Sequence, residues 1–345
     1  MSARPFHRSF LVTSIGAYAD SGIGTGGFTC LHDGEPVIVD KIDSTALCEA
    51  GGTIYRFARG LKSIIGYRAD GIRYTLALPE WRDIHDVLVQ DGAFVCVSTG
   101  TNEVLWIDPL GRLLRRVTME GADDAWHLNC LWEKDGRLFA SAFGRFSAHR
   151  EWVGKCTGTG MIFDLESGAD VFPGLCGPHN PRFIDGQWMV CNSHAQTLAI
   201  QQPDGAVKSV EMAGFTRGFA FDAGYFYIGE SANRKSETPP DCSSVAVVDR
   251  TTLEVVHRFT VPFPEIYDIH LVSPELARGI TSDLPRFQID RTDERIRALE
   301  TQVELGLREV ENYKEWVEKL RRPKQLRQAL TEVKRSIARS FTSRL

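Results

Sequence analysis

The chain has 345 residues, of which 43% are hydrophobic and 25% are charged, a balance typical of a folded globular protein and not of a disordered or fibrous one. No apolar stretch approaches the length of a membrane span, and no signal-peptide pattern is recognisable, so we expect a cytoplasmic protein. The eight cysteines show no paired spacing that would indicate a metal motif or a disulfide framework.

The charge is distributed unevenly along the chain. The formal net charge is −5, yet the segment from Lys319 to the end holds nine basic residues and one acidic residue, a net of +8. The rest of the chain therefore carries −13. This separation predicts a C-terminal segment with a role of its own, and an acidic main body argues against nucleic acid as a partner.

The first part of the chain consists of short apolar runs separated by turns. Residues 9–12 form one expected strand and residues 28–40 an expected hairpin. A further repeat begins at residues 46–48, and its next strands are expected at 53–58 and 63–67. No helical period separates these runs, which excludes a parallel sheet with crossover helices.

Four later stretches repeat one pattern, in which a polar residue precedes two apolar runs that are joined by a glycine turn. They begin at His85, His127, His179 and Arg217. In the first three the turn is Asp-Gly, which is a strong signal for a tight hairpin. With a fifth start at Asp268, the spacings are 42, 52, 38 and 51 residues. A repeat of about 45 residues made of short strands is typical of a β-propeller, with one four-stranded blade per repeat.

One late strand, at residues 267–272, has no complete blade after it. We expect it to pair with the N-terminal strands, because closing the ring removes exposed sheet edges. The prediction is an all-β, six-bladed propeller over residues 1–280, with five or seven blades as alternatives.

The chain after residue 285 reads as helical. Residues 286–322 carry apolar positions at alternating spacings of three and four, namely Ile296, Leu299, Val303, Gly306, Val310, Tyr313, Val317 and Leu320. This pattern predicts a coiled-coil helix that joins copies of the chain through residues 290–320, and a helix lying on its own propeller is the alternative.

Residues 323–345 form a second expected helix, since Pro323 ends the first. One face is apolar, with Leu326, Leu330 and Val333, and basic residues surround it. A basic amphipathic helix predicts peripheral membrane binding or contact with an acidic protein.

Propeller geometry brings the starts of the inner strands to one mouth of the central channel. The polar residues expected there are His85, Asp86, His127, Asn129, His179, Arg182, Arg217, Tyr267, Asp268 and His270. Buried polar groups need partners, so this cluster is either an internal network or a ligand site.

Three interpretations of the cluster are open. In the first, His127, His179 and Asp268 are catalytic, with a histidine acting as acid or base, and a pair of arginines clamps an anion. The expected substrate-binding residues are His85, Asn129, Arg182, Arg217 and Tyr267. In the second, His127, His179 and His270 hold a divalent metal. In the third, the residues only cap strands and fill the channel. No GxSxG motif is present, which disfavours a serine hydrolase.

Several separated motifs carry a resemblance to a family. They are Trp126-His127-Leu128-Asn129, Gly177-Pro178-His179-Asn180-Pro181-Arg182, Gly214-Phe215-Thr216-Arg217-Gly218-Phe219-Ala220-Phe221 and Glu265-Ile266-Tyr267-Asp268-Ile269. Over residues 9–275 the chain resembles an uncharacterised bacterial family of six-bladed propellers, some of which accompany glycan-modifying and sulfotransferase modules. It departs from the family at Asn180, where serine is common, and at Cys130, where aspartate is common. Likeness to strictosidine-synthase and lactonase propellers concerns the fold alone.

The resemblance and the mouth residues together suggest a function. We expect an enzyme of lyase, isomerase or hydrolase type that binds a small anionic, sugar-derived substrate, such as a uronate, a sugar phosphate or a nucleotide sugar. The alternative is a non-catalytic propeller that acts as a scaffold or glycan-binding partner in surface-polysaccharide assembly.

Overall fold

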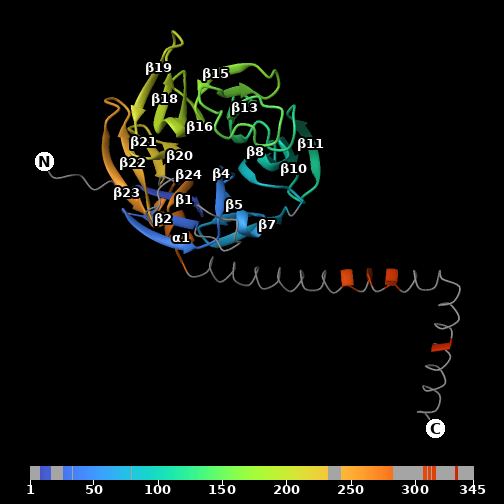
Figure 1. The fold of residues 1–345 in the computed structure, drawn as a ribbon. Coiled ribbons are helices and arrows are strands. Elements are labelled where there is room, and N and C mark those ends of the chain that lie inside the picture. Colours follow the sequence, from blue (N-terminus) through green and yellow to red (C-terminus); the bar gives the residue numbers. More distant parts are fainter. Residues whose placement is uncertain are drawn as a thin grey trace. The chain divides into compact units, whose positions relative to one another are not determined.

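The computed structural model describes residues 8–16, 26–32, 34–78, 80–231 and 242–282, together with residues 306–308, 310–311, 313–315 and 331–332. The chain divides into two units, Met1–Arg286 and Phe287–Leu345. The first unit contains six four-stranded antiparallel sheets around a central axis, which confirms the six-bladed β-propeller (Figure 1).

The inner strand of every blade contacts the inner strands of its neighbours. From the axis outward, blade 1 is β24 (Glu265–Val272), β1 (Ser9–Ile15), β2 (Gly27–His32) and β3 (Glu35–Asp40). Blade 2 is β4 (Ser44–Ala50), β5 (Thr53–Ala58), β6 (Ser63–Arg68) and β7 (Gly71–Ala77). Blade 3 is β8 (Ile84–Gln90), β9 (Ala93–Ser98), β10 (Glu103–Ile107) and β11 (Leu113–Thr118).

The other three blades follow in chain order. Blade 4 is β12 (Leu128–Lys134), β13 (Arg137–Ala142), β14 (Gly160–Asp164) and β15 (Asp170–Leu175). Blade 5 is β16 (Pro178–Ile184), β17 (Gln187–Asn192), β18 (Thr197–Gln201) and β19 (Val207–Glu211). Blade 6 is β20 (Phe215–Phe221), β21 (Tyr225–Ser231), β22 (Ser243–Asp249) and β23 (Val255–Val261).

The predicted ring closure is confirmed. The late strand β24 pairs antiparallel with β1, and Asp268 lies opposite Thr13. A short helix that the sequence pattern does not reveal, α1 (Pro274–Ile280), follows β24, and its first turn is capped by the Ser273 hydroxyl, which accepts from the Leu276 amide. Seven residues are too few to show a helical period, although Ala277 and Ile280 are fully buried against blades 1 and 2.

The Asp-Gly turns form as their sequence predicts. Both residues of each turn have positive φ, which the short Asp side chain tolerates and Gly adopts freely. The values are 50° and 78° at Asp91-Gly92, 52° and 75° at Asp135-Gly136, and 51° and 80° at Asp185-Gly186. Each of these turns joins an inner strand to the second strand of its blade.

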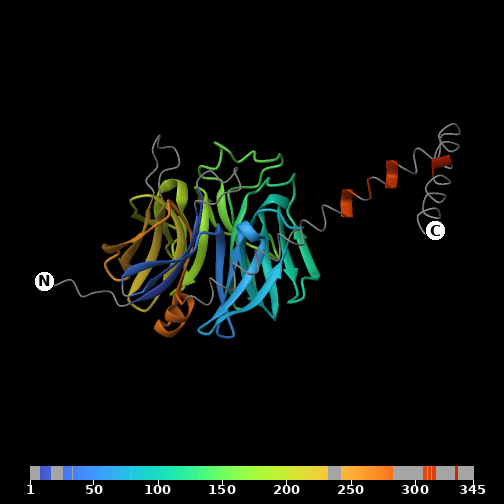
Figure 2. The same ribbon diagram turned by 90° about the horizontal axis from the view of Figure 1, so that it is seen from below.

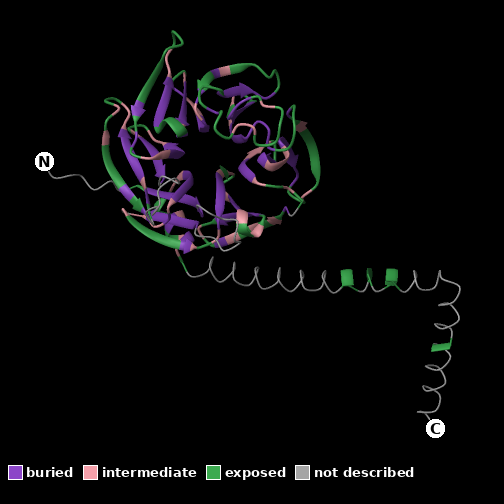
Figure 3. Ribbon diagram, in the orientation of Figure 1, coloured by how far each residue is buried: buried purple, intermediate pink, exposed green. Residues whose placement is uncertain are grey.

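The apolar core lies between the blades (Figure 3). Val95, Trp106 and Phe163 belong to one such cluster, which joins blades 3 and 4. Outer strands such as β11 are largely exposed, because their outer faces have no further sheet to cover them. The middle strand β9 is buried along its whole length, whereas half-buried and exposed positions alternate in the outer strand β7.

The two faces of the ring differ. Every inner strand begins on one face, which we call the mouth face. It also carries the 3-10 turns η2 (Arg59–Leu61), η3 (Thr99–Thr101) and η4 (Ser193–Ala195) and the loop of residues 143–159, because these follow second strands that end opposite the inner-strand starts. The helix α1 lies on the opposite face (Figure 2).

Only a few residues of the second unit are described, so the structure tests little of the two predicted helices. Residues 306–308, 310–311, 313–315 and 331–332 are helical, and their side chains are exposed. The rest of the predicted coiled-coil segment 286–322 and of the basic helix 323–345 lies outside the described residues, so their partners stay predictions. No helix in the described part of the chain is long and apolar enough to cross a membrane.

Candidate functional site

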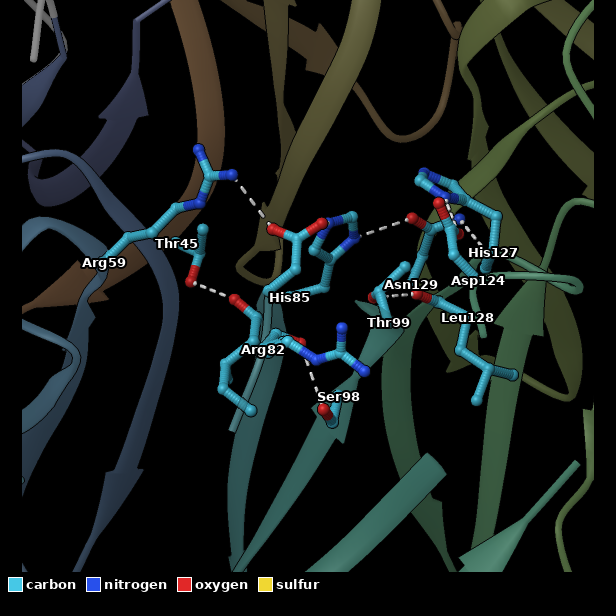
Figure 4. Close-up of polar contacts among 12 residues, drawn as sticks. Thr45, Arg59, Arg82, His85, Ser98, Thr99, Asp124, His127, Leu128 and Asn129 are labelled. Atoms are coloured by element: carbon cyan, nitrogen blue, oxygen red, sulfur yellow. Dashed lines mark hydrogen bonds and ion pairs between the residues drawn. The ribbon is translucent and has the colours of Figure 1, made fainter. Parts of the chain in front are cut away.

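His85 contacts an acceptor on each side of its ring, and Figure 4 shows the contact with Asn129. Its Nδ1 lies 3.1 Å from Asn129 Oδ1, and its Nε2 lies 3.2 Å from Asp83 Oδ2. Asn129 donates its amide group to the carbonyls of His127 and Pro178, which turns its oxygen toward His85.

Asp83 presents an ionised carboxylate to His85. Burial raises its pKa, but the contacts with His85 and Arg59 outweigh that effect and hold the pKa of Asp83 below its usual range. Arg59 Nη2 donates to Asp83 Oδ1 at 3.1 Å. Asp83 itself has a φ of +57°, a left-handed conformation that places its carboxylate beside the start of β8.

His127 forms a dyad with Asp124. Its Nδ1 lies 2.7 Å from Asp124 Oδ1, and because a carboxylate accepts, Nδ1 carries the proton and Nε2 presents its lone pair. Burial lowers the pKa of His127 to about 4, although the hydrogen bond to Asp124 opposes this shift. The ring is therefore neutral at pH 7 and free to accept a proton. Its side chain keeps 11% of its surface exposed, so it remains within reach of solvent.

Aromatic rings surround this dyad. The centroid of the His127 ring lies 4.0 Å from that of Trp152 and 4.4 Å from that of Phe143. The indole N–H of Trp152 donates to the Asp124 carbonyl at 3.1 Å. Trp152 belongs to the long loop of residues 143–159, so this loop forms one wall of the mouth.

His179 lies deeper and is fully buried. The Ser193 hydroxyl donates to the Thr216 carbonyl at 2.5 Å, so its oxygen accepts from His179 Nδ1 at 2.7 Å. The Gly177 carbonyl, 3.0 Å away, is a second acceptor for the same N–H. Nε2 therefore carries the lone pair. Burial, followed by the positive charge of Arg217, lowers the pKa of His179 well below its usual range, which keeps the ring neutral.

Arg217 and Tyr267 complete the mouth. Arg217 Nη1 lies 2.7 Å from Glu265 Oε1 in a buried ion pair, and the guanidinium sits over the Tyr267 ring at 4.6 Å. Burial raises the pKa of Tyr267 well above its usual value, so the phenol keeps its proton. The Tyr267 ring also contacts the His85 ring, with centroids 5.5 Å apart.

Three polar atoms in the mouth are buried and have no hydrogen-bond partner among the described residues. They are His179 Nε2, Arg217 Nε and Tyr267 Oη, which we call the inner triad. Their residues are at most 4% exposed. An unpaired buried polar atom costs about 1–3 kcal/mol. The three atoms comprise one acceptor, His179 Nε2, and two donors, Arg217 Nε and Tyr267 Oη.

Arg182 and Asp268 lie further along the channel, away from the inner triad. Arg182 donates Nε to the Phe219 carbonyl at 3.0 Å, and its guanidinium stacks on Trp132. The structure therefore does not bring Arg182 and Arg217 together as a clamp, and each already has acceptors in the chain. The Arg182 Nη2 atom approaches Asp268 Oδ1 at 4.0 Å.

Asp268 belongs to a pattern of alternate blades. Asp86 Oδ2 accepts from the Leu131 amide at 2.7 Å, Asn180 Oδ1 from the Gly218 amide at 2.7 Å, and Asp268 Oδ2 from the Leu47 amide at 3.0 Å. In each case a side chain from blade 3, 5 or 1 bonds the inner strand of the next blade. Asn180 also donates to Asp268 Oδ1 at 3.1 Å. These contacts give Asp268 a structural partner for each oxygen.

The two buried carboxyls affect each other. Burial, and then the negative charge of Asp268, raise the pKa of Asp86 to about 7. Burial also raises the pKa of Asp268, against the effect of Arg182. Asp86, Asp268 and Arg182 line a cavity of about 420 Å³ that opens away from the mouth face.

His270 lies at that cavity and not at the mouth. Its Nε2 is 3.4 Å from Glu49 Oε2, and its side chain is 27% exposed. The structure therefore does not bring His270 together with His127 and His179. Over the part of the chain that the structure describes, no group of three His, Cys, Asp or Glu residues could hold a metal ion.

The functional partners that sequence reasoning missed are Asp83, Asp124, Ser193 and Glu265. Asp83 and Asp124 lie two and three residues before a predicted histidine, a local signal that could have been read. Ser193 begins the turn after the second strand of blade 5, so nothing in the sequence pairs it with His179.

Comparisons with known proteins identify a family and a fold. Residues 78–278 match the family model described as "Domain of unknown function (DUF4915)". No curated protein matches the sequence. A protein of unknown function from Bacteroides caccae has 14% identity and a TM-score of 0.55, over 77% of this chain and 99% of that chain.

Two further solved structures are similar. A calcium-binding protein, regucalcin, from Agrobacterium tumefaciens has 17% identity and a TM-score of 0.50, over 68% of this chain and 79% of that chain. A luciferin-regenerating enzyme has 10% identity and a TM-score of 0.51, over 67% of this chain and 80% of that chain. At such identities the likeness shows the propeller fold alone.

Proposed function

The chain belongs to the DUF4915 family, whose description gives no function, and from the geometry of the mouth we propose that it is an enzyme that transfers a proton on a small, sugar-type substrate. His127 is the general base in this proposal. The reaction is of isomerase or lyase type, because both begin with removal of a proton by a neutral base.

The Asp124–His127 dyad carries the proposal. A general base needs a neutral ring at working pH, a fixed tautomer and access to substrate. The 2.7 Å contact with Asp124 fixes the tautomer, burial keeps the ring neutral, and the partly exposed edge of His127 provides access. As Nε2 takes up a proton, the Asp124 carboxylate stabilises the imidazolium that forms.

The walls of the mouth support a small sugar-type substrate. Trp152 and Phe143 offer flat apolar faces beside His127, and the centroid of the His85 ring lies 5.2 Å from that of His127. Ligand sites of this kind combine aromatic walls with a few fixed polar groups. Because the two predicted clamp arginines are apart and Arg217 is already paired with Glu265, the geometry favours an uncharged substrate over the expected anionic one.

The test is a turnover screen. Wild-type protein is incubated in D2O with aldoses, ketoses, uronates and aldonolactones, and NMR follows product formation and deuterium incorporation. We expect turnover of at least one compound by wild type. Asp124→Asn should reduce it by about 10²- to 10⁴-fold, because the dyad loses the group that holds and charges the base.

Asp108→Asn is the matched control, since Asp108 caps a turn at the outer part of blade 3. The control should turn over like wild type. Equal rates for Asp124→Asn and wild type would refute the role of the dyad. Compounds that bind but are never converted would favour the glycan-binding alternative.

A further inference from the structure

The inner triad lies deeper than the Asp124–His127 dyad, and its atoms indicate which chemical group of the substrate would bind there. This inference rests on the proposed function. We propose that the inner triad is a subsite for one uncharged hydroxyl group of the substrate. The hydroxyl donates to His179 Nε2 and accepts from Tyr267 Oη and Arg217 Nε.

The tautomer of His179 sets the first requirement. The Ser193 hydroxyl is committed to the Thr216 carbonyl, and Gly177 also offers a carbonyl to Nδ1. Both partners of Nδ1 accept, so the single proton of the neutral ring lies on Nδ1. Nε2 can then only accept, and its partner must donate.

The other two atoms set the opposite requirement. Tyr267 keeps its phenolic proton, and Arg217 Nε always carries a hydrogen, so both are donors in search of an acceptor. Arg217 lies next to Tyr267, since its guanidinium covers the Tyr267 ring, and its charge lowers the pKa of His179. The subsite thus offers one acceptor and two donors.

A hydroxyl group matches this set, because it has one hydrogen to give and two lone pairs to receive. A carboxylate would place its lone pairs against Nε2, and its charge has no cation to meet, because Glu265 already neutralises Arg217. An ammonium group has no lone pair to offer, so it would leave both donors without an acceptor. The substrate class is therefore a polyol or sugar, with its reacting carbon placed toward His127.

The experiment uses three probes with the same four-carbon chain and different ends: butane-1,4-diol, succinate and putrescine. The full-length protein carries ¹⁵N-labelled histidine, and NMR follows Nε2 of His179, which is assigned from its loss in His179→Asn. We expect an Nδ1–H tautomer in the free protein. Butane-1,4-diol should shift the Nε2 resonance saturably, and the other two probes should not.

Two variants make the result specific. Tyr267→Phe should lose the diol response, because one of the two donors is gone. Tyr67→Phe should keep it, because Tyr67 is a fully buried tyrosine of blade 2 that packs on Phe28 of blade 1. A response to succinate or putrescine in place of the diol, an equal diol response in Tyr267→Phe, or no response to any probe would overturn the subsite.

The proposed enzyme function and the proposed subsite can be refuted independently of each other. Asp124→Asn should keep the diol response while it loses turnover. A diol response in a protein that converts no sugar would leave the subsite standing and remove the enzyme proposal, whereas turnover without a diol response would do the reverse.

Discussion

The buried carboxyl of Asp86 makes stability depend on pH in a direction that the structure sets. Its folded pKa is about 7, against an ordinary value of 3.8, so the folded state holds a proton that the unfolded chain has released. Stability from this group is complete below about pH 4 and is lost as the pH rises through 7. At 1.36 kcal/mol per pH unit, the interval from pH 5 to 7 corresponds to about 3 kcal/mol.

Asp86→Asn should remove this dependence without breaking the channel. Asn180 shows that an amide fits the equivalent position of blade 5, where its oxygen accepts a backbone N–H from the next blade and its nitrogen donates to Asp268. Relative to wild type, the free energy of unfolding of the variant should rise by about 3 kcal/mol between pH 5 and pH 8. The measurement is urea unfolding followed by tryptophan fluorescence at several pH values.

The control for this prediction is Asp108→Asn. Hydrogen bonding to the Arg112 amide lowers the pKa of Asp108, so it is ionised throughout this range, and its substitution should have the same effect at every pH. If the difference between Asp86→Asn and wild type is also constant from pH 5 to pH 8, then Asp86 carries no extra proton in the folded state and the reasoning is refuted.

Three further predictions are independent of each other. Tyr267→Phe should leave the free energy of unfolding unchanged or raise it by up to about 1 kcal/mol, because it removes an unpaired buried hydroxyl. If urea unfolding shows a loss of more than about 1 kcal/mol, the hydroxyl has a hydrogen-bond partner. In the proposed reaction, kcat/KM should be constant above about pH 6 and fall with an apparent pKa near 4, because protonation disables His127; a midpoint near 6.5 would point to another base. Gly279→Ala should lower stability by about 2 kcal/mol or more, because its Cβ would meet the Ala69 carbonyl oxygen at 2.0 Å, and a Tm equal to that of wild type would contradict this packing of α1.

The blade order could be predicted because its signals are local. An Asp-Gly pair between two apolar runs specifies a hairpin by itself, and the polar residues before each run recur at blade spacing. Ring closure could be predicted because no complete blade follows β24 in the sequence, so this strand needed a partner from the N-terminal strands. The short helix α1 could not be predicted, because its stability comes from packing Ala277 and Ile280 onto blades 1 and 2.

The candidate site was predicted only in part, for a geometric reason. A strand rises about 3.3 Å per residue, so three residues move a side chain about 10 Å along the channel. His179 and Arg182 share one strand, as do Tyr267 and His270, and sequence reasoning placed all four at one rim. The structure separates them between the mouth and the opposite cavity. Partners such as Ser193 come from other strands and depend on the folded register.

Because β24 pairs with β1, blade 1 can form only after both strands have been synthesised. Tyr267 and Glu265 lie on β24, which is synthesised after every other described strand of the propeller, so the mouth stays incomplete until blade 1 is assembled from both ends of the propeller. A ligand that binds both Tyr267 and His179 would connect β24 to blade 5 and so stabilise the closed propeller. Amide hydrogen exchange at Val12 and Thr13, in the partner strand β1, would then slow as the ligand binds.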